Sequence, residues 1–278
     1  MEKLKHVLSS KQFGLGFFIN LYKDTALILE LMKTREGREL LTHILPGYVL
    51  GEMFWQESSR TYHSFAVAAQ RLGADVNSER GVKKTRLKDG KRLTRWELVF
   101  SSEAKDAYFE DEVRAWASFY DALVFRTAEE GLVARAAAIC DEFGYDVPII
   151  NAGDGKGEHP TQTLLDGFTV VGSLGLNLEK DWSRLKNYSV AFINDGKNSR
   201  TIHSLAWVLG VLFKMKLIFI APPGLEMPQE FLKELKIADC EYEERSELRT
   251  ADVYYVTRLQ EEYFKSQKEF EKYRNHFL

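Results

Sequence analysis

Short apolar runs alternate with longer stretches of helical spacing along most of this chain of 278 residues. The apolar runs occupy residues 122–125, 147–150, 189–193, 217–220 and 253–256, and a further one ends near Phe54. Stretches of helical spacing lie between them at 131–143, 162–174 and 200–214. Strands that alternate with helices predict parallel sheets whose two faces are both covered by helices. We therefore expect an α/β protein built from two doubly wound parallel-sheet domains with helices on both faces.

The position of the domain boundary follows from a change in composition. A chain of this length is long enough for two domains of ordinary size. The stretch from Asn151 to Thr161 is rich in glycine and polar residues, which is typical of a connection. The sequence therefore predicts one domain over residues 1–150 and a second over residues 151–278. Ligands of such folds bind at the carboxyl ends of the strands, so the residues that follow each strand are the candidates for chemistry.

Composition and charge exclude several classes of partner. The formal net charge is −3, which gives no general attraction to nucleic acid or to an anionic membrane, and we expect neither as a partner. Cys140 and Cys240 have no second cysteine or histidine at metal-ligand spacing, so we expect no metal site and a reducing compartment. The first residues lack the apolar core of a signal peptide, and no run is long enough to span a bilayer. These features predict a cytoplasmic protein.

One segment departs from the alternating pattern. Residues 83–95 contain seven basic side chains and one acidic one, with Asp89-Gly90 in the middle. An Asp-Gly pair between such flanks predicts a β-hairpin turn. Two interpretations of the charge stay open: a solvated surface hairpin, which we favour because charge runs are usually on the surface, or a source of positive potential for an anion site.

A first candidate site follows the run that ends near Phe54. The residues Ser58-Ser59-Arg60-Thr61 stand at the start of an amphipathic helix that is expected to continue to Leu72. A helix start offers free backbone N–H groups and the positive end of the helix dipole, and the hydroxyl and guanidinium groups suit a phosphate. An ordinary Ser/Thr cap beside a surface arginine explains the same residues equally well.

A second candidate follows the run at 147–150. His159 and Gln162 are three residues apart and would share one face of the helix that opens at Pro160, a residue that favours the first helical turn. The glycines between Asn151 and Gly157 allow the backbone to turn sharply before that helix. A connector whose histidine only caps the helix is the alternative interpretation.

Together the two candidates resemble the signatures of the carbamoyltransferase family. Residues 58–65, Ser-Ser-Arg-Thr-Tyr-His-Ser-Phe, are similar to the S-T-R-T-R-x-S-F element of that family. Residues 159–162, His-Pro-Thr-Gln, match its H-P-x-Q element, and the surrounding run from Asn151 to Asp166 is most similar to aspartate carbamoyltransferases. The resemblance covers the chain from its first helix to about Phe264. It implies transfer of a carbamoyl group from carbamoyl phosphate to the amine of L-aspartate, a step of pyrimidine biosynthesis, without a metal or cofactor.

The resemblance also implies roles for single residues. His159, Arg126 and Thr61 would contact the carbamoyl oxygen, and Gln162 would hold the carbamoyl NH₂ group. The phosphate would be held at the helix start by Ser58, Ser59, Arg60 and Thr61. It would also be held by Ser101 and Lys105, which lie in a mobile loop that reaches a neighbouring subunit. Because that loop acts in a neighbour, the resemblance implies a homotrimer with shared active sites.

Aspartate would be held by three residues of the second domain. Arg200 matches an arginine that binds aspartate, and Arg258 and Gln260 match an R-x-Q element that grips its side-chain carboxylate. Taken singly, Arg126 or Arg200 is more often a surface ion-pair partner, and Lys105 lies in an acidic stretch where it would pair for little energy. The order of all these residues along the chain favours the functional interpretation.

Several positions differ from the family pattern. Glu57 stands where a proline or small residue is usual, Ser59 replaces a threonine, and Tyr62 replaces a common arginine. Asp106-Ala107 replaces a Gly-Glu pair of the mobile loop, and the sequence ends before the family's H-P-L-P-R-like element. Two alternatives to an active aspartate carbamoyltransferase therefore stay open: a catalytically weak or regulatory homologue that binds carbamoyl phosphate, and a carbamoyltransferase for another amino acid. A regulatory chain is not identifiable from the sequence.

Overall fold

The computed structural model describes residues 4–88, 91–98, 108–155, 157–259, 264 and 266–274. Its contacts divide the chain into two compact units. Unit 1 contains residues 1–9 and 24–160, and unit 2 contains residues 10–23 and 161–278. The division along the chain thus falls after Pro160, ten residues beyond the boundary expected from composition, and a short N-terminal segment belongs with the second unit.

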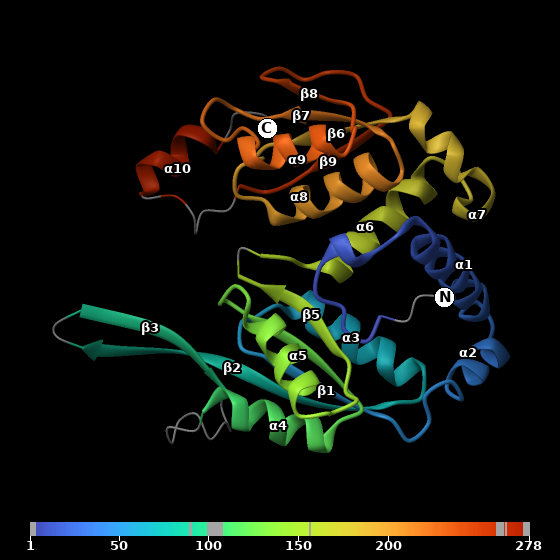
Figure 1. Cartoon of the computed structure of the whole chain (residues 1–278), viewed down its shortest axis with the longest axis vertical. Coiled ribbons are helices and arrows are strands. Elements are labelled where there is room, and N and C mark those ends of the chain that lie inside the picture. Colours follow the sequence, from blue (N-terminus) through green and yellow to red (C-terminus); the bar gives the residue numbers. More distant parts are fainter. Residues whose placement is uncertain are drawn as a thin grey trace. The chain divides into compact units, whose positions relative to one another are not determined.

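Unit 1 is built around a sheet with the strand order β3-β2-β1-β4-β5 (Figure 1). Strand β1 pairs in parallel with both β2 and β4, and β4 pairs in parallel with β5. The strands are β1 (Val49–Phe54), β2 (Asp75–Lys88), β3 (Lys91–Leu98), β4 (Ala122–Thr127) and β5 (Ile149–Asp154). The helices are α2 (Arg35–Leu41), α3 (Ser59–Arg71), α4 (Phe109–Phe119) and α5 (Leu132–Glu142), together with the second half of α1 (Leu15–Leu31).

The predicted hairpin is confirmed. Strand β3 pairs antiparallel with β2, and Lys88 is the register partner of Lys91. Figure 1 shows this hairpin extending well beyond the parallel part of the sheet. The side chains of residues 82–98 lie outside the described part of the chain, so the choice between a solvated hairpin and a source of positive potential stays a prediction.

Helices cover both faces of the sheet in unit 1. Along β1, Met53 and Trp55 point to the face on which α4 and α5 pack, and they join the larger apolar core there. Phe54 points to the opposite face, where Tyr62 and Phe65 of α3 pack against it. This alternation along a buried strand is what the period-2 geometry requires.

Unit 2 contains a second, four-stranded parallel sheet with the order β8-β7-β6-β9. Its strands are β6 (Ser189–Ile193), β7 (Lys216–Ile220), β8 (Tyr242–Arg245) and β9 (Val253–Val256). The accompanying helices are α6 (Pro160–Ser173), α7 (Leu178–Asp181), α8 (Arg200–Trp207), α9 (Gln229–Ile237) and α10 (Gln267–Tyr273), with the first half of α1. Short 3₁₀ turns at Ser10–Gln12 and Trp182–Asn187 and a π-helical turn at Val208–Leu212 complete the described elements.

The prediction of two parallel α/β sheets with surrounding helices is confirmed, with one strand placed wrongly. The run at 147–150 predicts a strand that ends at Ile150, but β5 begins at Ile149 and continues to Asp154. The polar residues continue the strand because they are paired there: the Asn151 backbone N–H donates to the Val7 carbonyl at 2.8 Å, and Ala152 is fully buried. The helix predicted over 200–214 is α8 followed by the π-helical turn.

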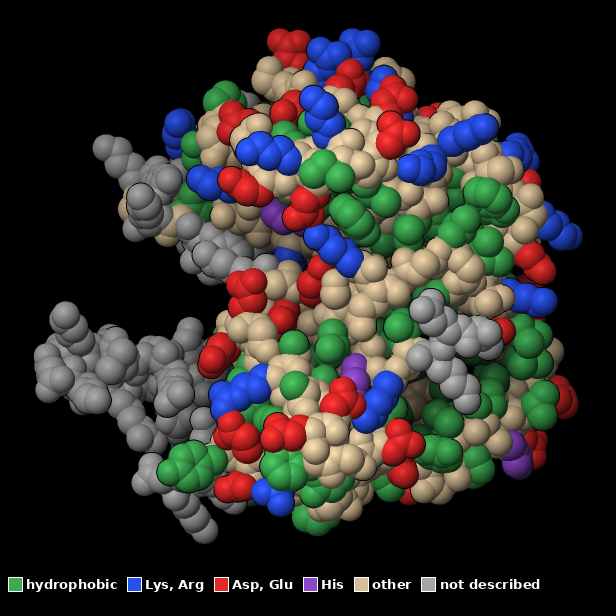
Figure 2. Space-filling model, in the orientation of Figure 1, with side chains coloured by type: hydrophobic (Ala, Val, Ile, Leu, Met, Phe, Trp, Pro, Cys, Tyr) green, Lys and Arg blue, Asp and Glu red, His purple; other side chains and the backbone are tan. Residues whose placement is uncertain are grey.

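The described surface carries charges of both signs. Figure 2 shows lysine and arginine side chains interspersed with aspartate and glutamate over the face in view. No described helix combines the length and the apolar character needed to cross a bilayer.

We predict that the aromatic core of unit 1 depends on Phe125. Its ring is 2% exposed and lies 5.4 Å from the ring of Trp55 and 6.0 Å from that of Trp116. Phe125→Ala should lower the free energy of unfolding by roughly 3–5 kcal/mol, because it removes buried area and leaves a cavity. Urea unfolding measures this loss. Phe119→Ala is the matched control: that ring is 69% exposed, and its loss should change stability by less than about 0.5 kcal/mol.

Candidate functional site

The sheet of unit 1 has its topological switch point between β1 and β4. From β1 the chain continues to β2 on one side of the sheet, whereas β4 and then β5 lie on the other side. Crossover helices diverge at such a point, and ligands of open α/β sheets bind outside the carboxyl ends of the strands there. The candidates selected from the sequence lie just after β1, at Ser58 to Thr61, and near the end of β4, at Arg126.

The helix start after β1 is built without a side-chain cap. Ser58 is the N-cap of α3 and has extended backbone geometry, but its side chain makes no capping bond to the backbone. Its hydroxyl instead donates to the Thr61 Oγ1 at 2.9 Å. The N–H groups of the first turn have no partner within the helix, and the exposed Ser59 and Arg60 stand among them. This is the arrangement that binds an oxyanion.

Arg126 lies beside this helix start. Its Cα is the register partner of Phe54, and the Trp55 backbone N–H donates to its carbonyl at 2.8 Å. The side chain is only 8% exposed, and its Nη1 donates to the Ala152 carbonyl of β5 at 2.6 Å. The register between β4 and β5 shifts at this position, between Phe125 and Thr127. A buried guanidinium is thus held at the switch point by the backbone of the neighbouring strand.

The connection from β5 to α6 is held by Asp154, which sequence analysis did not single out. The buried Asp154 carboxylate accepts hydrogen bonds from the backbone N–H of Glu158 at 2.6 Å and of Gly131 at 3.3 Å. Gly155 has φ +61° and lies so close to the Ala128 carbonyl that a Cβ would meet it at 2.3 Å. This turn fixes His159, which directly precedes α6 and is 8% exposed.

Unit 2 repeats the same topological arrangement. β6 pairs in parallel with β7 on one side and with β9 on the other, so the switch point lies between β6 and β9. The loop after β6 is held by the fully buried Asp195, whose Oδ1 accepts from the Asn198 backbone N–H at 2.9 Å and from its Nδ2 at 3.0 Å. Asn194 joins the two strand ends, because its Nδ2 donates to the Thr257 carbonyl at 2.7 Å.

The predicted aspartate-binding arginines of unit 2 follow these two strands. Arg200 is the first residue of α8, after the buried N-cap Ser199. Arg258 comes two residues after the end of β9 and is exposed. The structure therefore places both arginines at the carboxyl edge of the same sheet, next to its switch point.

Gln162 lies in the first turn of α6 and belongs to unit 2. Its Nε2 donates to the Asp166 Oδ1 at 2.9 Å, and the Tyr255 hydroxyl donates to the Asp166 Oδ2 at 2.7 Å. Burial raises the pKa of Asp166, while the bonds from Tyr255 and Gln162 act in the opposite direction. Asp166 is a second residue that sequence analysis missed; its position one helical turn after Gln162 is the signal that would have indicated it.

Three predicted residues cannot be placed. Ser101, Lys105 and Gln260 lie outside the described residues, as does the Asp106-Ala107 pair. Besides Ser59 at the start of α3, two departures from the family pattern lie in the described part of the chain. The Glu57 side chain is exposed, and the Tyr62 ring lies 3.6 Å from the guanidinium of Arg80 on β2. A cation is therefore present beside Tyr62, although residue 62 itself is not an arginine.

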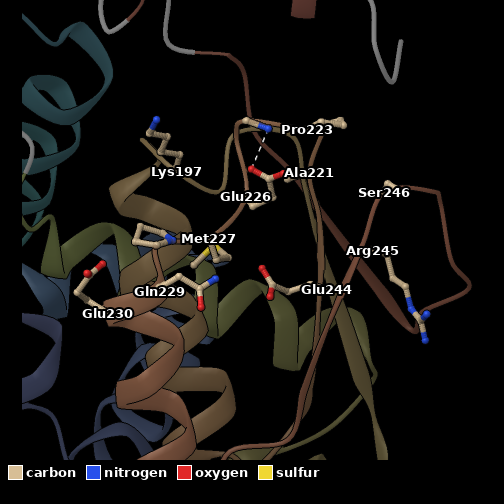
Figure 3. A pocket seen from close by; sticks show the side chains of 12 residues that line it. Lys197, Ala221, Pro223, Glu226, Met227, Gln229, Glu230, Glu244, Arg245 and Ser246 are labelled. Atoms are coloured by element: carbon tan, nitrogen blue, oxygen red, sulfur yellow. Dashed lines mark hydrogen bonds between the residues drawn. The ribbon is translucent and has the colours of Figure 1, made fainter.

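A cavity of about 810 Å³ lies elsewhere in unit 2, at the carboxyl ends of β7 and β8 (Figure 3). Its lining includes Glu226, Glu244 and Met227, and Glu226 accepts a hydrogen bond from the Gly224 backbone N–H at 2.8 Å. None of the predicted site residues that the structure describes lines it. The switch points carry the matching residues, so we place the candidate chemistry there and not in this cavity.

The fold and these residues define a protein with two parallel α/β units and candidate oxyanion-binding groups at the switch point of each sheet. The model of the aspartate/ornithine carbamoyltransferase carbamoyl-P binding domain matches residues 5–171. The aspartate carbamoyltransferase catalytic subunit of Methanocaldococcus jannaschii is 33% identical over 97% of this chain and 78% of the relative.

Solved structures give the same result. The catalytic subunit of M. jannaschii aspartate transcarbamoylase superimposes with a TM-score of 0.78 at 30% identity, covering 99% of this chain and 80% of that one. Aspartate transcarbamoylase from Trypanosoma cruzi in complex with carbamoyl phosphate and aspartate superimposes with a TM-score of 0.74 at 28% identity, covering 97% and 77%. The chain belongs to the aspartate/ornithine carbamoyltransferase family.

We predict that Asp154 is required to hold the turn before His159. Asp154→Ala leaves the N–H groups of Glu158 and Gly131 without their acceptor, so the free energy of unfolding should fall by about 1–3 kcal/mol. Chemical denaturation measures the change. Asp146→Ala removes an exposed carboxylate from the same region and should cost less than about 0.5 kcal/mol; equal losses for the two variants would contradict the role of Asp154.

Proposed function

We propose that this protein transfers the carbamoyl group of carbamoyl phosphate to the amine of L-aspartate, giving N-carbamoyl-L-aspartate and phosphate for pyrimidine biosynthesis. One observation carries the proposal: residues that match the family's motifs follow the central strands at the switch point of each sheet. Relatives of the chain are aspartate carbamoyltransferases by name, and a T. cruzi relative was solved with carbamoyl phosphate and aspartate.

The phosphate group is held at the start of α3. Carbamoyl phosphate is a dianion, and the first-turn N–H groups, the dipole of the helix and the side chains of residues 58–61 all favour negative charge there. Arg60 adds a guanidinium whose paired N–H groups match two phosphate oxygens. Unit 1 is thus the carbamoyl-phosphate-binding part of the chain in this proposal.

The carbamoyl oxygen is held by His159, Arg126 and Thr61. When the aspartate amine attacks the carbamoyl carbon, a C–N bond forms, the amine loses a proton, and the carbonyl oxygen becomes negative in a tetrahedral intermediate. The bond from that carbon to the phosphate oxygen then breaks, and phosphate leaves. Donors fixed before the reaction stabilise the developing charge without reorganisation, which is the main source of catalysis in such sites. The backbone bonds of Arg126 and the Asp154 turn before His159 supply that rigidity.

Aspartate is held by Arg200, Arg258 and Gln260 in unit 2. Two arginines match two carboxylates, and a guanidinium binds a carboxylate through two parallel hydrogen bonds. An amino acid with a neutral or cationic side chain would leave Arg258 without its partner. Preference for aspartate over ornithine follows from that difference.

We predict that the purified protein forms N-carbamoyl-aspartate from its two substrates and that His159→Ala lowers turnover by about 10²–10³-fold. That loss corresponds to the roughly 2.7–4 kcal/mol that removal of one oxyanion donor costs. A colorimetric assay of the product measures both. His43→Ala, which removes an exposed histidine from unit 1, is the control and should retain full activity.

Three results would contradict this proposal. Full turnover by His159→Ala would refute the role of that residue. Carbamoylation of glutamate or ornithine in preference to aspartate would identify a carbamoyltransferase for another amino acid. Tight calorimetric binding of a mimic that joins a phosphonate to an aspartyl group, without any product formation, would identify a homologue that binds but does not turn over.

We also propose that the protein works as a cytoplasmic homotrimer in which Ser101 and Lys105 act in the site of a neighbouring subunit. In that case Lys105→Ala and His159→Ala damage the same site from two different chains. Each variant alone should be nearly inactive, whereas dissociated and reassembled mixtures of the two should regain activity, because some sites then receive both native residues. Light scattering should give the mass of three chains. Mixtures that stay inactive although trimers form would refute the sharing of sites.

A further inference from the structure

Asp166 links α6 to β9 of unit 2 through partly buried hydrogen bonds. It lies on α6, one helical turn after Gln162, and its two carboxylate oxygens accept from two different side chains. Gln162 Nε2 donates to Oδ1 at 2.9 Å, and the Tyr255 hydroxyl of β9 donates to Oδ2 at 2.7 Å. The side chain of Thr201, the residue after Arg200 on α8, lies within hydrogen-bonding reach of Tyr255. The contacts therefore run from Gln162 through Asp166 and Tyr255 to Thr201, the neighbour of Arg200.

The direction of each bond is determined by the chemistry of Asp166. An ionised carboxylate only accepts hydrogen bonds, so the Gln162 amide must turn its NH₂ group toward Asp166. A glutamine amide has one donor end and one acceptor end, and the surrounding bonds decide which way it is turned. The tyrosine also stays a donor, because burial and the Asp166 charge raise the pKa of Tyr255 above its usual range.

This orientation leaves one atom of Gln162 for the substrate. Among the described residues, no hydrogen bond uses the Gln162 Oε1. A carbamoyl group carries an NH₂ donor, which an amide oxygen accepts, whereas a reversed amide would place its own NH₂ against that of the substrate. An acyl group with a methyl in place of NH₂ has nothing to donate to Oε1.

We propose that Asp166 is a positioning residue that fixes the Gln162 amide with its oxygen outward and thereby selects carbamoyl over other acyl phosphates. The inference rests on the proposed function and deepens it, since it names the interaction that recognises the carbamoyl NH₂. Asp166 touches neither substrate. It acts through Gln162, and its bond to Tyr255 fixes its own carboxylate in place.

Two stable phosphonates test this selection directly: phosphonoacetamide, which keeps the NH₂, and phosphonoacetone, which carries a methyl in its place. Calorimetry on the wild-type protein should show tighter binding of the amide by about three- to tenfold, the range expected for one net hydrogen bond. Asp166→Asn has nearly the same shape but offers its own NH₂ to Gln162 and allows the amide to reverse. The preference should then fall to within about twofold, through weaker binding of the amide and unchanged binding of the ketone.

Four further variants show whether Asp166 acts through Gln162. Asp166→Ser introduces a smaller acceptor and should also reduce the preference for the amide. It replaces Asp166→Asn if that variant does not fold. Gln162→Ala should also remove the preference, and adding Asp166→Asn to it should change the preference no further. Thr169→Ala, which alters α6 at an exposed side chain, should leave the preference intact.

The outcomes separate this inference from the proposed function. An undiminished preference in Asp166→Asn, or an equal loss for both phosphonates as expected from a purely structural role, overturns the inference alone. A wild-type protein that binds neither compound overturns the proposed function and the inference with it.

Discussion

Parallel pairing of one central strand with neighbours on both sides is the constraint on which both groups of candidate residues depend. β1 pairs with β2 and β4, and β6 pairs with β7 and β9. Parallel neighbours end at the same edge of a sheet, so residues far apart in sequence are brought together there. Arg126 thus lies next to Phe54, and Thr257 next to Asn194, although more than sixty residues separate each pair. No sequence proximity is needed to assemble either group.

Buried aspartates hold the loops at these edges. Asp154 accepts the backbone N–H groups that close the turn before His159, and Asp195 does the same in the loop before Arg200. Asp166 accepts from two side chains instead and so joins α6 to β9. A buried carboxylate is costly unless such donors surround it, and when they do it makes its surroundings rigid. Catalysis by positioning requires that rigidity, because the donors must be in place before charge develops.

The sequence predicted the strands best where they are continuously apolar. The runs at 189–193 and 253–256 coincide with β6 and β9, because neither run contains a charged residue or a glycine that would obscure the strand. β5 was placed too early because Asn151, Gly153 and Asp154 are typical of loops, and only the pairing with β4 and Val7 shows that they continue the strand. Asp89-Gly90 predicted the hairpin correctly from local turn chemistry alone.

The candidate site was predictable to the extent that its motifs are contiguous. The residues at 58–61 and 159–162 were found because each motif is a short run after a strand. Asp154 and Asp166 were missed because their function depends on the bonds that they accept, and spacing does not reveal these bonds. An aspartate in an amphipathic helix usually faces solvent, and only the contact with Tyr255, 89 residues away, shows that Asp166 does not.

The two helix starts share a feature that stability alone does not explain. α3 and α8 both begin after a serine N-cap that makes no side-chain bond to the backbone. The Ser58 hydroxyl pairs with Thr61 at 2.9 Å, and that of Ser199 pairs with Thr201 at 3.1 Å. A capping bond is worth about 0.5–2 kcal/mol, so each helix forgoes a stabilising contact that its serine is suited to make. The N–H groups of a helix's first turn are those that an anion would bind, and an arginine stands in the first turn in both cases. With a net charge of −3 the chain has no general field that attracts anions, so local groups of this kind must provide the attraction. The proposed anion binding at both switch points therefore explains both uncapped helix starts with one cause. A purely structural explanation would need a separate reason for each helix.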